Sequence, residues 1–392
     1  MIRCLLLAPT PGADVENGDV QYCRDLLDSP PNGVEYVTYP EALASGEIRD
    51  MPSLRKGTGL PRGLRQLGWA LVRSVVHGIR RSGMLLPDPV HWWEIVGEFD
   101  VVHSHCFPVR LTGRVPPVVV TDSAGTFWYW TAAQGRSERD VWKLLRRERR
   151  IAQRIGYIHP TVTPDSANRT LYFVAQGRGL AERLAIDGSC IQVAPAGVPD
   201  ATAQAPLALD PPTLLFVARN FEVKGGPAAL DVLRAVRREF PTCRLMVAGP
   251  TTPDPGIEGV AWLGAKSRAE LYADVYPRAD LFLYPTTFDC APLVVVEAMA
   301  HGVPVVAPRA FGLPDLVQHG TTGLLVEPGD TGQLTRSVLA LLGDPDRLRR
   351  MGSAAADDVR SRLSIAVRNE KLLAAYQVGR RPAAQTIMPP TS

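Results

Sequence analysis

The sequence predicts an α/β protein built from two doubly wound domains that face each other across a crevice. Short apolar runs alternate with helical patterns along most of the chain, which is typical of parallel sheets covered by helices. A stretch rich in Pro and Ala and without any period, residues 198–212, interrupts this alternation. The length of 392 residues suits two domains of ordinary size.

Each half of the chain carries its own series of short, apolar strand candidates. In the first half we expect strands at residues 3–8, 34–38, 101–103, 118–121, 155–163 and 191–193. In the second half we expect them at residues 214–218, 244–248, 260–263, 281–284, 303–307 and 323–326. Such runs are typical of buried parallel strands. Doubly wound sheets bind ligands at the crevice outside the carboxyl ends of their strands.

The end of the chain is predicted to be helical and then disordered. After Asp330 the pattern is helical to Leu363, and a last helix is expected over residues 364–378. The final segment has the composition of a disordered tail. We therefore expect an N-terminal domain, a C-terminal domain, the last helix and the tail over residues 1–200, 201–363, 364–378 and 379–392.

The composition is that of a soluble globular protein, with 45% hydrophobic and 21% charged residues. The net charge of +3 is too small to indicate a nucleic-acid partner. Six scattered cysteines without a CxxC pair argue against a disulfide framework and a structural zinc site, and fit a reducing cytosol. The apolar start is too short for a signal peptide, and no run approaches the roughly 20 apolar residues of a membrane-spanning helix. A cytoplasmic location is therefore expected.

Two carboxylates bracket an apolar segment that is predicted to form a buried helix. In TTFDCAPLVVVEAMAHGVPVVAP, residues 286–308, Asp289 precedes a helix that begins near Pro292, and Glu297 lies in its second turn. Both acids are expected at the open end of the second sheet, where carboxylates can accept hydrogen bonds from sugar hydroxyls. The structural alternative is that Asp289 caps the helix and Glu297 forms an internal ion pair.

Two cations follow a predicted buried strand in FVARNFEVKGG, residues 216–226. Arg219 and Lys224 lie in the loop before a Gly-Gly pair that opens the next helix. At the carboxyl end of a strand, Arg offers a planar fork and Lys a point charge, so the two residues predict a pyrophosphate clamp. The alternative is a pair of solvated loop cations.

These segments together resemble the signature region of the family 4 (group 1) retaining glycosyltransferases of GT-B fold. The resemblance rests on two acids eight residues apart, followed by EAMAHGVPVVAP, GLPD and TGLLVEPGD. FVARNFEVKGG is similar to the donor-phosphate segment of that family, and RLMVAGP to one of its following strands. In the first half, LLLAPTPGADVENGDV, FDVVHSH and IQVAPAGVPD are similar in the same order.

The resemblance implies a GT-B enzyme with two Rossmann-like domains that moves a sugar from a nucleotide-sugar to an acceptor with retention of the anomeric configuration. It implies no bound metal and no cofactor beyond the nucleotide-sugar, and a last helix that crosses back to the first domain. Asp289, Glu297, Arg219 and Lys224 match the catalytic positions. The remaining donor-side matches are Gly18, Pro292, Leu293 and Val294.

The sequence departs from the family pattern on the acceptor side and at the first acid. Many relatives have T-x-H where this chain has Thr121-Asp122-Ser123, so Asp122 and Ser123 become acceptor-side candidates, together with His105 of the FDVVHSH strand. Trp128 of TFWYW, residues 126–130, is a further candidate as a stacking surface for a sugar, with core packing as the equal alternative. The first acid is Asp289, where the family usually has Glu.

Basic residues gather in residues 49–82, where eight cations accompany one acid. A helix with this pattern could contact an anionic membrane at the inner face, which would suit a lipid-linked acceptor. The favoured alternative is an ordinary covering helix with solvated arginines. The segment 142–154 allows the same two interpretations. DPD, at residues 344–346, matches a D-x-D metal motif but is interpreted as a loop cap.

Three functions compete on these observations. The first is a glycosyltransferase with a glycan, lipid-linked or small-molecule acceptor. The second is a non-catalytic partner subunit, which the missing T-x-H histidine favours. The third is a sugar-nucleotide epimerase of GT-B fold, which would bind the same donor without an acceptor.

Overall fold

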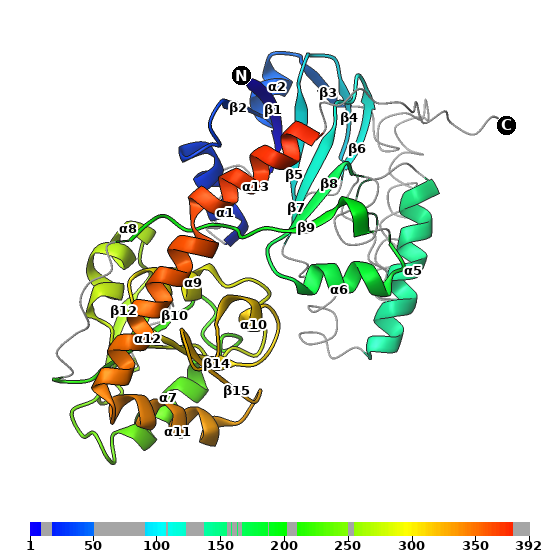
Figure 1. The fold of residues 1–392 in the computed structure, drawn as a ribbon. Helices are drawn as coiled ribbons and strands as arrows, with labels where there is room; N and C mark the ends of the chain where they lie inside the picture. Colours follow the sequence, from blue (N-terminus) through cyan, green and yellow to red (C-terminus); the bar gives the residue numbers. More distant parts are fainter. Residues whose placement is uncertain are drawn as a thin grey trace, which may run out of the picture.

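This computed structural model of the protein describes residues 1–8, 18–50, 91–106, 109–122, 137–154, 158, 163, 167–186, 188–201, 210–249 and 255–378. Two six-stranded sheets form the centres of two halves, and a three-stranded sheet lies beside the first of them. Figure 1 shows the first half above the second, with a loop drawn in green that runs from β9 towards the second half. The predicted α/β fold of two doubly wound sheets is confirmed.

The first six-stranded sheet has the strand order β2-β1-β5-β7-β8-β9, and all its pairings are parallel. Its strands are β1 (Ile2–Leu7), β2 (Val34–Thr38), β5 (Val101–His105), β7 (Val118–Asp122), β8 (Arg169–Tyr172) and β9 (Ile191–Val193). Its helices include α1 (Gly18–Asp28), α2 (Tyr39–Ala44), α5 (Glu138–Arg154) and α6 (Gln176–Arg183). Between α6 and β9 lies the short helix η3 (Gly188–Cys190).

The second sheet has the order β12-β11-β10-β13-β14-β15 and is also parallel throughout. Its strands are β10 (Thr213–Val217), β11 (Arg244–Ala248), β12 (Val260–Gly264), β13 (Leu281–Leu283), β14 (Val305–Pro308) and β15 (Gly323–Val326). Its helices are α7 (Gly226–Val236), α8 (Arg268–Glu270), η4 (Leu271–Val275), η5 (Tyr276–Arg278), α9 (Leu293–Ala300), α10 (Leu313–Leu316), α11 (Thr331–Leu342), α12 (Pro345–Asp358) and η6 (Val359–Leu363).

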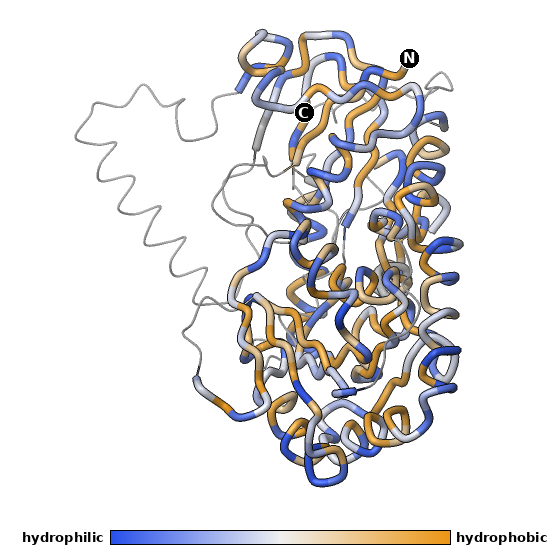
Figure 2. Tube along the Cα trace, turned by 90° about the vertical axis from the view of Figure 1, so that its left-hand side faces the viewer, coloured by the Kyte–Doolittle hydropathy of each residue, from blue (hydrophilic) through white to orange (hydrophobic). Residues whose placement is uncertain are grey.

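Successive side chains of a strand point to opposite faces of the sheet, and each face packs into its own hydrophobic core. In β10, Leu215 and Val217 pack into one buried cluster with α9, while Leu214 and Phe216 pack into another with α7 and α11. Helix α7 reaches its cluster through Ala229, Val232, Leu233 and Val236, which recur every three or four residues along one helical face. Figure 2 shows that the interior strands are largely hydrophobic and that hydrophilic residues gather on outer turns.

Two features of the first half differ from the sequence prediction. Most of the strand expected at residues 155–163 lies outside the described residues; within it, Ile158 makes an isolated bridge to Val109. Strand β8, which follows, was not predicted. The small sheet of β3 (Ile48–Asp50), β4 (His91–Ile95) and β6 (Val109–Gly113) was not predicted.

Helix α13 (Ile365–Val378) follows the second half in the chain but packs on the first, and Figure 1 shows it, in red, alongside α1. Tyr376 belongs to the buried cluster of β1 and α1, and its hydroxyl contacts the hydroxyl of Tyr36 at 2.8 Å. The fully buried Arg368 donates to backbone oxygens of Asp25 and Ser29 at the end of α1. The domain boundaries at residues 200 and 363 remain predictions.

Several sequence interpretations fall on segments outside the described residues. These are most of the basic segment 49–82, the aromatic run 126–130 and the tail 379–392. Among the described helices, none is long and apolar enough to cross a membrane. The D-x-D match at residues 344–346 is a cap, as predicted, because the Asp344 side chain accepts a hydrogen bond from the Arg347 N–H at the start of α12.

Candidate functional site

A cavity of about 920 Å³ lies between the two halves. Parallel sheets present the carboxyl ends of their strands to such a crevice, so loops and helix starts from both halves line it. The first half contributes Asp19, Gln21, Tyr22, Phe173 and Ala196. The second half contributes a larger set, which includes Arg219, Lys224, Arg268, Tyr284, Asp289, Pro292, Leu293, Val294 and Glu297. All the catalytic candidates predicted from the sequence therefore meet in one cavity.

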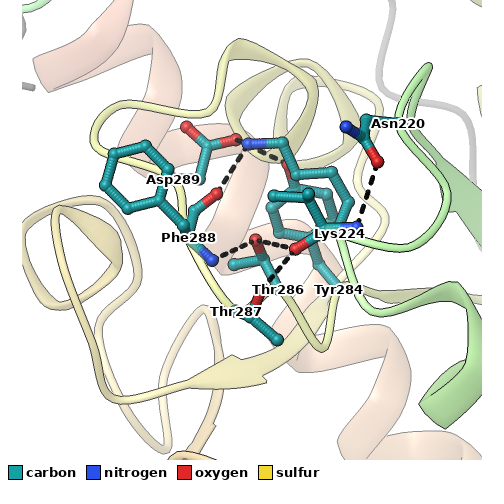
Figure 3. A network of polar contacts seen from close by, with 8 residues as sticks. Asn220, Lys224, Tyr284, Thr286, Thr287, Phe288 and Asp289 are labelled. Atoms are coloured by element: carbon teal, nitrogen blue, oxygen red, sulfur yellow. Dashed lines mark hydrogen bonds and ion pairs between the residues drawn. The ribbon is translucent and has the colours of Figure 1, made fainter. Parts of the chain in front are cut away.

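Lys224 and Asp289 form an ion pair at the wall of this cavity (Figure 3). The Lys224 ammonium donates to Asp289 Oδ2 at 2.6 Å and to the Phe288 carbonyl at 2.7 Å. The Tyr284 hydroxyl donates to the same carboxylate oxygen at 2.6 Å. Burial, and then the Asp289 charge, hold the pKa of Tyr284 well above its usual value, so this hydroxyl remains a donor at neutral pH. The alternative in which Asp289 caps the helix is wrong, because α9 has no side-chain cap.

The loop that carries Lys224 is held against the end of β13 by a glycine. Gly225 has φ +83°, and a Cβ at this position would lie 1.9 Å from the Pro285 carbonyl oxygen. Only glycine combines this conformation with so close an approach. The Asn220 side chain accepts from the Val223 N–H at 3.1 Å and closes the loop from the other end. The turn after β10 thereby fixes the position of Lys224.

Glu297 lies in α9, is only 3% exposed and has both carboxylate oxygens engaged. Its Oε1 lies 2.8 Å from Arg268 Nε, and its Oε2 accepts from the Tyr276 hydroxyl at 2.8 Å. Burial raises the pKa of the Glu297 carboxyl, while Arg268 and Tyr276 oppose that shift. The ion-pair interpretation from the sequence is thus correct, and the residue also lines the cavity.

Arg268 connects this pair to the first half of the molecule. Its Nη1 donates to both carboxylate oxygens of Asp25 in α1, at 2.6 and 2.7 Å. Asp25 and Arg268 are 243 positions apart in the chain. Pattern reading along the sequence misses such a contact, because the two residues belong to segments far apart in the chain. The Asp25–Arg268–Glu297 triad is therefore a finding of the structure.

The start of α9 supplies three of the remaining donor-side candidates. Pro292 precedes the helix in an extended conformation, and Leu293 and Val294 follow as its first residues. The first N–H groups of a helix lack intrahelical partners, so such a helix start attracts anions. Arg219 lies two residues after the end of β10 and lines the same cavity. The predicted pyrophosphate clamp and the helix start therefore share one space.

The acceptor-side candidates are placed less directly. Gly18, the donor-side candidate of the first half, begins α1, but its neighbour Asp19 is the residue that lines the cavity. His105 is fully buried behind the wall, and Asp122 is 6% exposed; neither lines the cavity. Ser123 and Trp128 lie outside the described residues. Asp19 was not among the candidates predicted from the sequence, although an acid directly follows Gly18 there.

Known proteins match this chain over its second half and, in some cases, over most of its length. Residues 211–344 match the family model described as glycosyl transferases group 1. A D-inositol 3-phosphate glycosyltransferase of Mycobacterium sp. (strain JLS) is 36% identical over 88% of this chain and 82% of its own length. A protein of the same name from Nocardia farcinica is 31% identical, with coverage of 67% of this chain and 63% of its own length.

A solved structure confirms the fold at lower sequence identity. The Anabaena protein HepE, in a complex described as holding UDP and glucose, has a TM-score of 0.59 and 16% identity. The match covers 96% of this chain and 100% of that protein. The curated relatives differ in coverage, and this chain spans less than two thirds of the Nocardia protein. By its 36% identity to the Mycobacterium protein over 88% of its length, the chain belongs to the group 1 glycosyltransferases of GT-B fold.

Proposed function

We propose that this protein is a retaining glycosyltransferase that moves a sugar from a nucleotide-sugar donor to a hydroxyl of an acceptor. The observation that carries the proposal is the convergence of Arg219, Lys224, Asp289 and Glu297 on one cavity between the halves. In the reaction, the bond from the anomeric carbon to the diphosphate breaks and a bond to the acceptor oxygen forms. The acceptor proton leaves with the nucleoside diphosphate.

Lys224 is suited to stabilise the diphosphate as negative charge develops on it. An ammonium group has three N–H donors, and two of them bond to Phe288 and Asp289. The third remains for a phosphate oxygen. Arg219 and the first N–H groups of α9 would add donors around the same anion. We propose that these groups take the part of a metal at the diphosphate, so that the reaction needs no cofactor beyond the donor.

The two carboxylates are suited to orient the donor. Asp289 uses Oδ2 for Lys224 and Tyr284, and no hydrogen bond from a described residue reaches its Oδ1. Oδ1 can therefore accept from a hydroxyl of the transferred sugar. Glu297 is fixed by Arg268 and Tyr276, and a carboxylate oxygen can accept a second hydrogen bond, here from a ribose hydroxyl. Fixed acceptors of this kind hold a reactant without further reorganisation.

The similar proteins suggest which substrates to test first. The HepE complex is described with UDP and glucose, and the Mycobacterium relative is named for D-inositol 3-phosphate. We propose a UDP-sugar as the first donor, and cyclitol phosphates as the first of the small-molecule acceptors. Glycans and lipid-linked acceptors form the second group to test.

The experiment is a donor panel followed by product analysis. UDP-, GDP-, dTDP- and ADP-sugars are incubated with the protein, with and without an acceptor, and nucleoside diphosphate release is measured by mass spectrometry. NMR then gives the anomeric configuration of the product. The proposal predicts slow hydrolysis of one donor, faster release with a suitable acceptor, and retention. A well-folded protein that binds no donor would contradict it and favour a non-catalytic partner subunit.

A further inference from the structure

A cluster of three different ligand types lies at the carboxyl ends of the strands of the first sheet. Asp19 is in the first turn of α1, His105 ends β5, and Cys106 follows it. One ligand atom from each of the three lies within 4.8 Å of those of the other two. These residues come from two different elements, so the fold, and not the local sequence, brings them together.

Asp19 Oδ1 lies near the ligand atoms of both other residues. It lies 3.4 Å from His105 Nε2 and 3.8 Å from Cys106 Sγ. The first distance is longer than an ordinary N–H···O hydrogen bond, and the second is that of a weak hydrogen bond from a thiol. They are close to the separation of about 3.3–3.5 Å that oxygen, nitrogen and sulfur ligands have around a tetrahedral zinc ion. The cluster needs only a small contraction to surround a cation.

His105 points a lone nitrogen into the cluster. Its side chain is fully buried, and Nε2 makes no hydrogen bond of ordinary geometry to a described residue, although Asp19 Oδ1 lies 3.4 Å away as an ion-pair partner. The other ring nitrogen, Nδ1, lies 2.9 Å from Thr121 Oγ1. An unsatisfied buried nitrogen is costly unless a partner binds there, and a metal ion is such a partner.

Behind His105, a chain of hydrogen bonds connects its Nδ1 to other buried groups and can run in either direction. Thr121 Oγ1 also lies 2.9 Å from His103 Nε2, and His103 Nδ1 lies 2.7 Å from the Tyr376 hydroxyl. If His105 Nδ1–H donates to Thr121, each later group can donate to the next, as far as Tyr36. This direction leaves the lone pair of Nε2 facing Asp19. Metal-binding histidines have this kind of support behind the ring.

Cys106 is held in an uncommon conformation that directs it to the same place. Its φ is +51°, a left-handed value that is rare for residues other than glycine and that occurs preferentially at functional sites. Its thiol donates to Asp122 Oδ1 at 3.3 Å. Asp122 is thus placed to take the thiol proton when a metal binds, because only the thiolate is a metal ligand.

We propose that Asp19, His105 and Cys106 bind a divalent transition-metal ion, Zn²⁺ in the first place. The sulfur and imidazole ligands favour Zn²⁺ over Mg²⁺ or Ca²⁺, which prefer oxygen. Three protein ligands leave a fourth position, and the 44% exposed Asp19 side chain lines the cavity, so that this position opens towards it. A mixed site of this kind needs no CxxC pair. It lies on the first sheet, separate from the proposed diphosphate clamp, and goes beyond the proposed function.

The test is a cobalt titration of the full-length protein after chelator treatment. Co²⁺ replaces Zn²⁺ in such sites, and a thiolate ligand gives a charge-transfer absorption band. The proposal predicts one saturable equivalent of Co²⁺ with this band, displaced by added Zn²⁺. Cys106→Ser removes the band. Asp19→Asn, at a partly exposed position, weakens the Co²⁺ affinity about 10-fold or more. Cys190→Ser, which changes another half-buried cysteine, in η3, leaves the band unchanged.

Two outcomes would overturn the proposal. One is a wild-type protein without a thiolate-to-cobalt band. The other is a Cys106→Ser protein with the wild-type band. Circular dichroism establishes that each variant is folded, and the Asp19→Asn affinity decides the matter if Cys106→Ser does not fold. No nucleotide-sugar is present in the titration, so its result is independent of the donor panel.

Discussion

Lys224 and Asp289 satisfy each other's charge at 2.6 Å, while Lys224 keeps a donor and Asp289 an acceptor for a ligand. Glu297 is likewise held by Arg268 and Tyr276 on opposite oxygens. At the residue scale, the site is therefore organised before any donor binds. Fixed charges of this kind are the groups that stabilise a developing anion most effectively.

The effect of burial on a pKa can be tested at Asp280. It is 6% exposed and accepts from the Thr213 N–H at 2.7 Å, and burial raises the pKa of its carboxyl to about 6, against this hydrogen bond. The folded state therefore holds this proton more tightly than the unfolded state, whose value is near the ordinary 3.8. The stability of the wild type relative to Asp280→Asn should fall by about 3 kcal/mol as pH rises from about 4 to above 6.

Thermal unfolding of both proteins across this pH range measures the difference. The asparagine carbonyl can still accept from Thr213, so the variant serves as its own structural control. A difference in melting temperature that does not change with pH would show that Asp280 titrates normally in the folded protein.

At the scale of elements, the turn between β10 and α7 decides where Lys224 lies. Gly225 and Gly329 share the same φ of +83°, but a Cβ at Gly225 would lie 1.9 Å from Pro285 O, whereas nothing lies within 4 Å at Gly329. Gly329→Ala should cost about 1–2 kcal/mol from backbone conformation alone. Gly225→Ala should cost more and also weaken donor binding, because the loop must move away from β13.

Melting temperatures and donor calorimetry of the two variants check this prediction. Gly329→Ala carries the conformational cost without the clash, so it isolates the effect of the close approach. Equal losses of stability in both variants, with unchanged donor affinity, would mean that the Gly225 contact does not position the loop.

Most strands of the two large sheets could be predicted from the sequence because buried parallel strands are continuous apolar runs. Strand β8 was missed, since RTLY is short and the neighbouring run at residues 155–163 has more β-branched residues. The small sheet of β3, β4 and β6 was missed because its strands come from segments far apart in the chain, and their pairing depends on the assembled fold. The local sequence pattern predicts where a strand lies in the chain better than it predicts which strands pair with it.

At the scale of the whole molecule, buried charges join the two halves. Asp25 of α1 meets Arg268, which meets Glu297, and α13 crosses back to place Arg368 on the end of α1. The Asp315 carboxylate also accepts from the Ala175 N–H across the halves at 2.8 Å. The candidate site residues could be predicted from the sequence because each lies within a single motif. The partners that fix them could not, because contacts over such sequence distances depend on the assembled fold.

Removing one member of this triad should loosen the contact between the halves. Asp25→Ala leaves Arg268 with Glu297 as its only carboxylate partner in the triad, and breaking a buried ion pair costs about 3–5 kcal/mol. Asp28→Ala, one turn further along α1 at an exposed position, should change stability by less than about 0.5 kcal/mol. Thermal unfolding compares the two variants. An Asp25→Ala protein as stable as Asp28→Ala would show that the triad does not stabilise the assembled fold.

The central claim, that this cavity binds a nucleotide-sugar through a pre-formed cationic clamp, is tested most directly by calorimetry of Lys224→Ala. The titrant is the donor that the panel identifies, and Lys143→Ala, which removes an exposed lysine on α5, is the matched control. We predict wild-type affinity for Lys143→Ala and an affinity about 10- to 100-fold weaker for Lys224→Ala, since a hydrogen bond to a charged group is lost. Unchanged donor affinity in a folded Lys224→Ala protein would contradict the account.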